Sequence, residues 1–63
     1  MNVYHLQIIN GDKTYETEVK ANILAWSDAG LYEFAQTETG TRVVVAYYPV
    51  SKTVIHKIDY NVK

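Results

Sequence analysis

The chain has 63 residues, no Cys, and a formal net charge of −1 from six basic and seven acidic side chains. This length allows a single domain over residues 1–63 with a thin core, and the lack of Cys excludes disulfides and thiolate metal sites. The near-neutral charge argues against a dedicated nucleic-acid binder and against a polybasic membrane-surface protein. No segment approaches the ~20 apolar residues that span a bilayer, and no signal-peptide pattern opens the chain, so we expect a soluble, cytoplasmic protein.

The N-terminal third of the chain predicts a β-hairpin. Apolar and polar side chains alternate on both sides of Asn10-Gly11, a pair that favours a type I′ turn. A two-residue loop places Leu6 opposite Tyr15, whereas a four-residue loop places Ile8 opposite Tyr15. The apolar faces coincide in both registers, so both remain open.

A kink is expected at Lys20-Ala21-Asn22, and the segment that follows has two interpretations. Residues 23–26 and 31–37 are rich in strand formers, and Ser27-Asp28-Ala29-Gly30 between them is typical of a type I turn. A helix over residues 21–36 competes, because several apolar residues there have helical spacing. Gly30 falls inside this segment and disfavours the helix, so strand–turn–strand is preferred.

The stretch Thr41–Ile58 contains the most strongly strand-forming residues, with an unbroken apolar and aromatic run from Val43 to Tyr48. It predicts two strands joined by a short turn at Pro49, with the other strands arranged around the first. The apolar run indicates a strand covered on both faces, or the middle of a strongly curved sheet. In the second strand, the residues expected to share one face are Val54, His56, Ile58 and Tyr60.

Short strands separated by frequent turn signals are typical of all-β proteins. At this length they predict a small antiparallel meander of 5–6 strands, forming an SH3-like or partly open barrel. Closure of the barrel removes the exposed strand edges that such a meander otherwise presents.

No residue pattern supports catalysis. The two Ser residues lack a nucleophile-elbow signature, and no Gly-rich loop is present to hold a phosphate. His5 and His56 would approach Glu16 or Asp59 if the first and last strands paired, but no full set of metal ligands is visible. A cross-strand polar pair with the region of Glu16 is therefore favoured for His5, and we expect no enzyme activity, no metal and no cofactor.

Protein binding is the function class that the sequence favours most. Six Tyr, one Trp and one Phe exceed what so small a core can hide, and exposed Trp and Tyr often dominate interfaces. Trp26 either fills the core or lies exposed in the interface, and both interpretations stay open. The predicted partner-binding residues are His5, Glu16, Glu18, Trp26, Tyr48 and Tyr60. A homodimer or small homo-oligomer formed through an unpaired edge strand would also stabilise the thin core.

Two alternatives remain. A small barrel can bind nucleic acid by stacking bases beside basic side chains, here Arg42, Tyr47, Tyr48 and Lys52, although the near-neutral charge disfavours this. An oligomer can instead sequester a nucleotide between its subunits. As a whole, this tiny, Cys-free, Tyr-rich chain without a catalytic signature resembles accessory proteins encoded by phages and mobile elements. That resemblance implies a protein that blocks one host protein or sequesters a small ligand.

Overall fold

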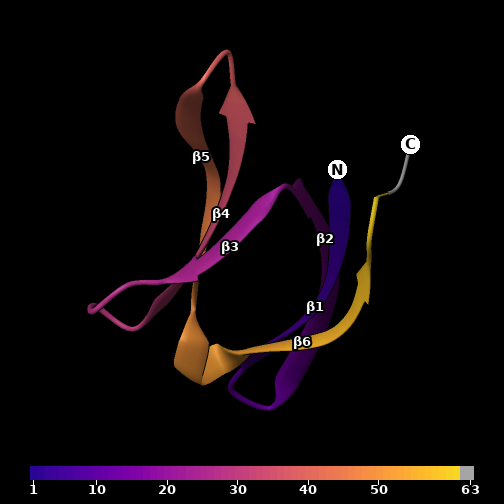
Figure 1. The fold of residues 1–63 in the computed structure, drawn as a ribbon. Coiled ribbons are helices and arrows are strands. Elements are labelled where there is room, and N and C mark those ends of the chain that lie inside the picture. The colour runs from indigo at the N-terminus through magenta and orange to yellow at the C-terminus, as the bar shows by residue number, and fades with distance from the viewer. Residues whose placement is uncertain (62–63) are drawn as a thin grey trace.

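The structure is a computed structural model that describes residues 1–61. These residues form two three-stranded antiparallel sheets, with strand orders β2-β1-β6 and β3-β4-β5 (Figure 1). The elements are β1 (Asn2–Asn10), β2 (Lys13–Ala21), β3 (Ile23–Trp26), β4 (Leu31–Glu38), β5 (Thr41–Pro49), the 3₁₀ turn η1 (Val50–Lys52) and β6 (Thr53–Asp59). The all-β prediction is confirmed and the strand arrangement is consistent with a small meander, but the described residues form no closed barrel.

The N-terminal hairpin has the register predicted for the four-residue loop, with Ile8 opposite Tyr15. Pairing ends at Asn10 and Lys13, so the turn between them has two central residues. Only the first of these, Gly11, has a positive φ, at 65°. A type I′ turn needs positive φ at both central positions, so the predicted turn type is wrong. Glycine at the first central position is typical of a type II′ turn.

A sharp bend at Asn22 lets one stretch of chain serve both sheets. β2 pairs with β1 before the bend, and β3 pairs with β4 after it. The Asn22 amide donates a hydrogen bond to the Ala35 carbonyl at 3.0 Å, which extends the β3–β4 ladder into the corner. Figure 1 shows β2 and β3 meeting there at an angle. The predicted kink and the strand–turn–strand interpretation are confirmed, and the helical alternative is wrong.

β5 is an edge strand and does not occupy the centre that the sequence predicted for it. It pairs only with β4, and its exposed side chains include Val43, Val45 and Tyr47, the last at 55%. β5 and β6 belong to different sheets and are joined by η1, where the Val50 amide donates to the Gly30 carbonyl at 2.9 Å. The prediction was wrong because β-branched and aromatic residues favour a strand whether or not both of its faces are covered.

The last strand returns to pair with β1, but its alternation is interrupted. The register skips His56, which is the extra residue of a β-bulge. Ile55 and Ile58, on either side of it, both pack against the core as a result. The expectation that Val54, His56, Ile58 and Tyr60 share one face is therefore wrong.

The core between the sheets is small. Leu6 and Phe34 are its largest fully buried side chains. The Phe34 ring contacts Tyr4 and Tyr48 edge-on, at centroid distances of 5.1 and 6.0 Å. Trp26 is 68% exposed, so the interpretation that it fills the core is wrong. Tyr4 and Tyr48 surround Phe34 in the core instead of Trp26.

Replacing Phe34 by Ala is expected to lower the free energy of unfolding by about 3–5 kcal/mol, because it leaves a cavity at the contact between the sheets. A domain of this size has only about 3–9 kcal/mol in total, so the variant should be largely unfolded or close to it. Trp26→Ala is the matched control and should change the stability by less than about 1 kcal/mol, because the indole is mostly in water. Urea unfolding followed by circular dichroism measures both. Equal losses in the two variants would contradict this description of the core.

The tip of the β4–β5 hairpin carries a strained residue. Thr39 and Gly40 have φ values of 48° and 80° and form the two central positions of a type I′ turn. A β-branched side chain disfavours positive φ, whereas Asn tolerates it. Thr39→Asn should therefore raise the free energy of unfolding by about 0.5–1 kcal/mol. Thr37→Asn, two residues earlier in the regular part of β4, is the control and should be neutral or destabilising in the same urea titration.

Candidate partner-binding site

His5 links all three strands of the first sheet. It lies on β1, the middle strand, on the face opposite to the buried Tyr4 and Leu6. Its Nδ1 is 3.3 Å from Oε1 of Glu18 on β2, and its Nε2 is 2.7 Å from Oδ2 of Asp59 on β6. A cross-strand polar pair was predicted for His5 with the region of Glu16; the structure has such a pair, but the residue opposite His5 is Glu18, and β6 adds a second carboxylate.

The hydrogen bond with His5 is the main cause that holds the pKa of Asp59 below its ordinary value of 3.8. Burial acts in the opposite direction, and the positive charge of Lys57, whose Nζ is 3.6 Å from Oδ1 of Asp59, adds to the lowering. A carboxyl group whose pKa is lower in the folded state stabilises the fold above its ordinary pKa. That contribution is lost as the pH falls through the lowered value.

A shallow pocket of about 190 Å³ lies beside His5. It is lined by His5, Glu16, Thr17, Glu18 and His56. The two carboxylates come from β2, and the His56 ring comes from the β6 bulge with its centroid 6.3 Å from that of His5. Pockets for drug-sized ligands have volumes of about 300–1,000 Å³, so this one suits a single side chain. No Lys or Arg belongs to its lining, so Glu16 and Glu18 give the pocket an acidic wall.

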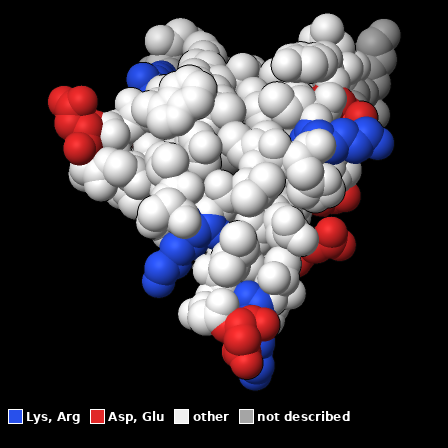
Figure 2. All heavy atoms as spheres, turned by 90° about the horizontal axis from the view of Figure 1, so that it is seen from below, with Lys and Arg blue, Asp and Glu red and all other residues white. Residues whose placement is uncertain are grey.

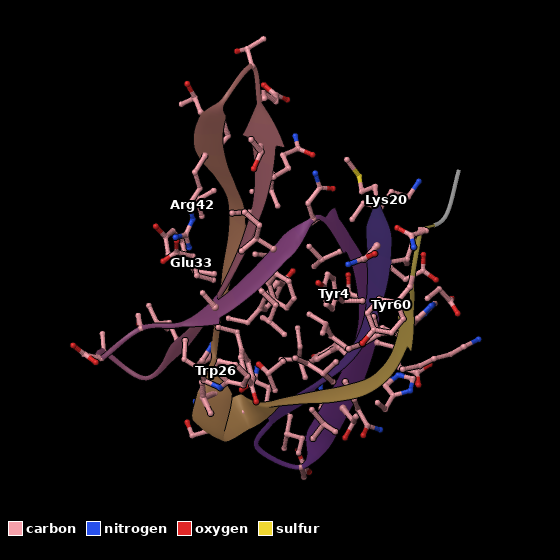
Figure 3. All side chains as sticks on the ribbon, in the orientation of Figure 1. Tyr4, Lys20, Trp26, Glu33, Arg42 and Tyr60 are labelled. Atoms are coloured by element: carbon pink, nitrogen blue, oxygen red, sulfur yellow. The ribbon has the colours of Figure 1, made fainter. Side chains whose placement is uncertain are left out.

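The structure brings together three of the predicted partner-binding residues, namely His5, Glu16 and Glu18, and leaves the other three outside this pocket. Trp26 and Tyr48 lie on the other sheet, where they flank Tyr32 on the face toward the core. Figure 3 shows Trp26 at the lower left, away from the sheet that carries Tyr60. Tyr60 follows β6 and is 68% exposed, but it does not line the pocket. One continuous surface of all six residues is therefore not formed.

The end of the molecule near Trp26 is a second exposed surface. The centroids of the Trp26 and Tyr32 rings lie 5.8 Å apart, and Trp26 is the exposed member of this pair, at 68%. Seen from below, uncharged atoms cover most of the molecule, and one basic side chain extends from near the middle of this view (Figure 2). This surface is available for contacts, but it presents no group that selects a particular partner.

The four residues of the nucleic-acid alternative do not share one surface, although Arg42 and Tyr47 both lie beside Glu33. Arg42 forms an ion pair with Glu33, as Figure 3 shows on the outer side of the second sheet. Tyr47 pairs with Glu33 across the strands and shares its face, whereas Tyr48 packs toward the core on the opposite face. Lys52 lies in η1, which belongs to neither sheet. Stacking platforms for bases need aromatic and basic groups along one groove, and here one of the two predicted tyrosines packs into the core.

The sequence did not single out His56, Thr17 or Asp59 as binding residues. Asp59 and His56 reach the site only because β6 pairs with β1, with a bulge at His56. The predicted pairing of the first and last strands would have indicated that Asp59 and His56 lie near His5. Thr17 lines the pocket from a β2 position whose side-chain face alternates away from Glu16 and Glu18, so alternation gave no indication of it.

The sequence matches no protein family, and no similar characterised protein or solved structure was found. Within residues 1–61, no group of three or more His, Asp or Glu side chains is placed to hold a metal ion. The same part of the chain has no helix that is long and apolar enough to cross a membrane. The functional argument therefore rests on the geometry of the pocket.

Replacing Asp59 by Asn should make the stability less sensitive to acid, because it removes a carboxyl group whose pKa the fold lowers. Between pH of about 5 and 2, the free energy of unfolding of the wild-type protein should fall more steeply than that of Asp59→Asn. The control is Asp28→Asn, an exposed position in the β3–β4 turn that has no charged partner among the ion pairs of the structure. Its pH profile should match that of the wild-type protein, and a steep profile retained in Asp59→Asn would contradict the role of this contact.

Proposed function

We propose that the protein is a non-catalytic binding module whose pocket beside His5 receives a basic side chain of a partner protein. The observation that carries this proposal is a pocket with two carboxylates, from Glu16 and Glu18, and no basic residue in its lining. The whole chain has a net charge of only −1, so this local excess of acid is not a consequence of an acidic composition. Complementary charge of this kind favours specificity and fast association.

The spacing of the two carboxylates suits a Lys or Arg group. Glu16 and Glu18 lie two residues apart on the same face of β2, which separates their Cα atoms by about 7 Å. A guanidinium group has five donors in a planar fork and can contact one carboxylate with two hydrogen bonds while facing the other. His56 closes the opposite side of the pocket and adds no fixed charge when it is neutral.

The fold supports a module of this kind. We infer an SH3-like arrangement from three features: the strand that bends at Asn22, the 3₁₀ turn before the last strand, and the return of that strand to β1. The broader role, in which an accessory protein of a phage or mobile element inhibits a host protein, stays a prediction. A homodimer is also still a prediction; within the described residues β2, β6, β3 and β5 are edge strands, and β5 is one that could pair with a second copy.

Two double variants test the pocket with the same change in net charge. Glu16→Gln with Glu18→Gln removes both carboxylates from the pocket, whereas Asp12→Asn with Glu38→Gln removes two from the hairpin tips. We expect the first variant to bind the partner at least about 10-fold more weakly, because it loses two charge-assisted contacts. The second variant should bind like the wild-type protein.

The measurement is a pull-down from lysate of the source organism with each tagged variant at low and high salt, followed by binding assays on the protein that co-elutes. Equal binding by the two double variants would contradict the proposal. Nucleic acid that elutes steeply with salt would support the nucleic-acid alternative instead. A nucleotide retained without any partner protein would support the alternative that the protein sequesters a ligand.

A further inference from the structure

His5 faces a carboxylate at each of its two ring nitrogens. The distances are 3.3 Å from Nδ1 to Glu18 Oε1 and 2.7 Å from Nε2 to Asp59 Oδ2. Ionised carboxylates only accept hydrogen bonds, and a neutral imidazole has a single N–H. Only the imidazolium form can donate to both carboxylates. In the neutral form one of the two hydrogen bonds is lost.

The unequal distances identify the contact that persists in the neutral form. The contact with Asp59 has hydrogen-bond length, and the contact with Glu18 is longer. A neutral His5 therefore keeps its N–H on Nε2 and turns the lone pair of Nδ1 toward Glu18. Glu18, whose side chain is 60% exposed, then receives no hydrogen bond from His5 and is free to contact a ligand in the pocket.

The other charged groups around His5 do not remove this dependence. From β2, Glu16 and Glu18 face the pocket, and from β6 the neighbouring groups are His56, Lys57 and Asp59. Lys57 lies directly opposite His5 on β6, carries a constant charge and is 3.6 Å from Asp59, but it does not line the pocket. Lys20, two residues after Glu18 on the same face of β2, also carries a constant charge and does not line the pocket. Protonation of His5 adds a positive charge to the pocket wall and engages Glu18, and protonation of His56 acts in the same direction.

We propose that the pocket accepts a basic side chain only when His5 is neutral, so that binding and protonation of His5 exclude each other. When the cationic group enters, the proton on Nδ1 of His5 passes to solvent and Glu18 exchanges its hydrogen bond with His5 for one with the ligand. This inference rests on the proposed function and adds its regulation. The partner is held at neutral pH and released in mildly acidic conditions.

The test uses acetyl-arginine amide as the probe and acetyl-citrulline amide as its neutral control, with amide NMR shifts of Gln7, Thr17 and Glu18 as the readout. The arginine probe should bind at least about 5-fold more weakly at pH of about 5.5 than at about 7.5, a ratio typical of coupled sites. The citrulline probe should not bind at either pH. By reciprocity, adding the arginine probe at pH of about 6.5 should lower the protonated fraction of His5, which its ring proton shifts report.

Variants identify the group responsible. In His56→Gln the ratio of affinities between the two pH values should stay above about 3, whereas in His5→Gln with His56→Gln it should fall to about 1. The Gln side chain retains an amide donor for Asp59, which limits the damage to the sheet. If the double variant does not fold, the ring titration of the wild-type protein with and without the probe decides the question by itself.

Each outcome separates the two proposals. Binding of the arginine probe with equal affinity at both pH values, or an unchanged His5 titration, would overturn the exchange with the proton and leave the proposed function standing. A pH dependence that survives in the double variant would overturn the role of His5. Failure of the probe to shift these amides at any pH would overturn the basic-side-chain pocket, and the regulation with it.

Discussion

The Tyr4 and Phe34 rings meet edge to face between the two sheets, 5.1 Å apart between centroids, and join their two middle strands. Edge-on contacts of this kind add to the hydrophobic stabilisation from burial of the rings. Leu6 is the other large side chain that is fully buried, so few groups hold the sheets together. A chain this short buries only about 60% of the surface of its unfolded form. The bend at Asn22 and the turn η1 are the two connections that bring these inner faces together.

This arrangement places the core and the proposed binding pocket on opposite faces of the same sheet. The inner face of β1 presents Tyr4 and Leu6 to the core, while the outer face presents His5 beside carboxylates from β2 and β6. This division follows from the alternation along a strand, because successive side chains point to opposite sides of the sheet. Substitutions in the proposed pocket should therefore leave the packing between the sheets intact. The exposed indole of Trp26, on the other sheet, lies outside both the core and this pocket.

Local patterns were sufficient to predict the hairpin, the kink before Asn22 and the two strands around Gly30, because each depends on neighbouring residues. The β4–β5 register also skips a residue, Val45, between Val44 and Ala46. Neither this bulge nor the one at His56 was predictable, since bulges follow from which strand pairs with which and their residue types give no signal. The edge position of β5 was missed for a related reason: apolar strand formers do not reveal whether a neighbouring strand covers them.

The part of the candidate site on the N-terminal hairpin was predictable, and the part contributed by β6 was not. Alternation and the hairpin together grouped His5 with Glu16 and Glu18, because all three point away from the core. Asp59 and His56 come from the other end of the chain, and their positions depend on a register with a bulge. The separation of Trp26 from this group depends on the path of the chain through the bend at Asn22, which alternation within one strand does not describe.

His5 connects the three strands of the first sheet on its outer face. Its contact with Asp59 needs one donor, on Nε2, while its Nδ1 faces Glu18. A lysine at this position would carry a permanent charge, and an asparagine would present an amide that does not titrate near neutral pH. In the exchange proposed above, histidine keeps the link between the strands while its second nitrogen takes up or releases the proton. Under that proposal, the residue in the middle of the sheet sets the charge that a partner meets at the surface.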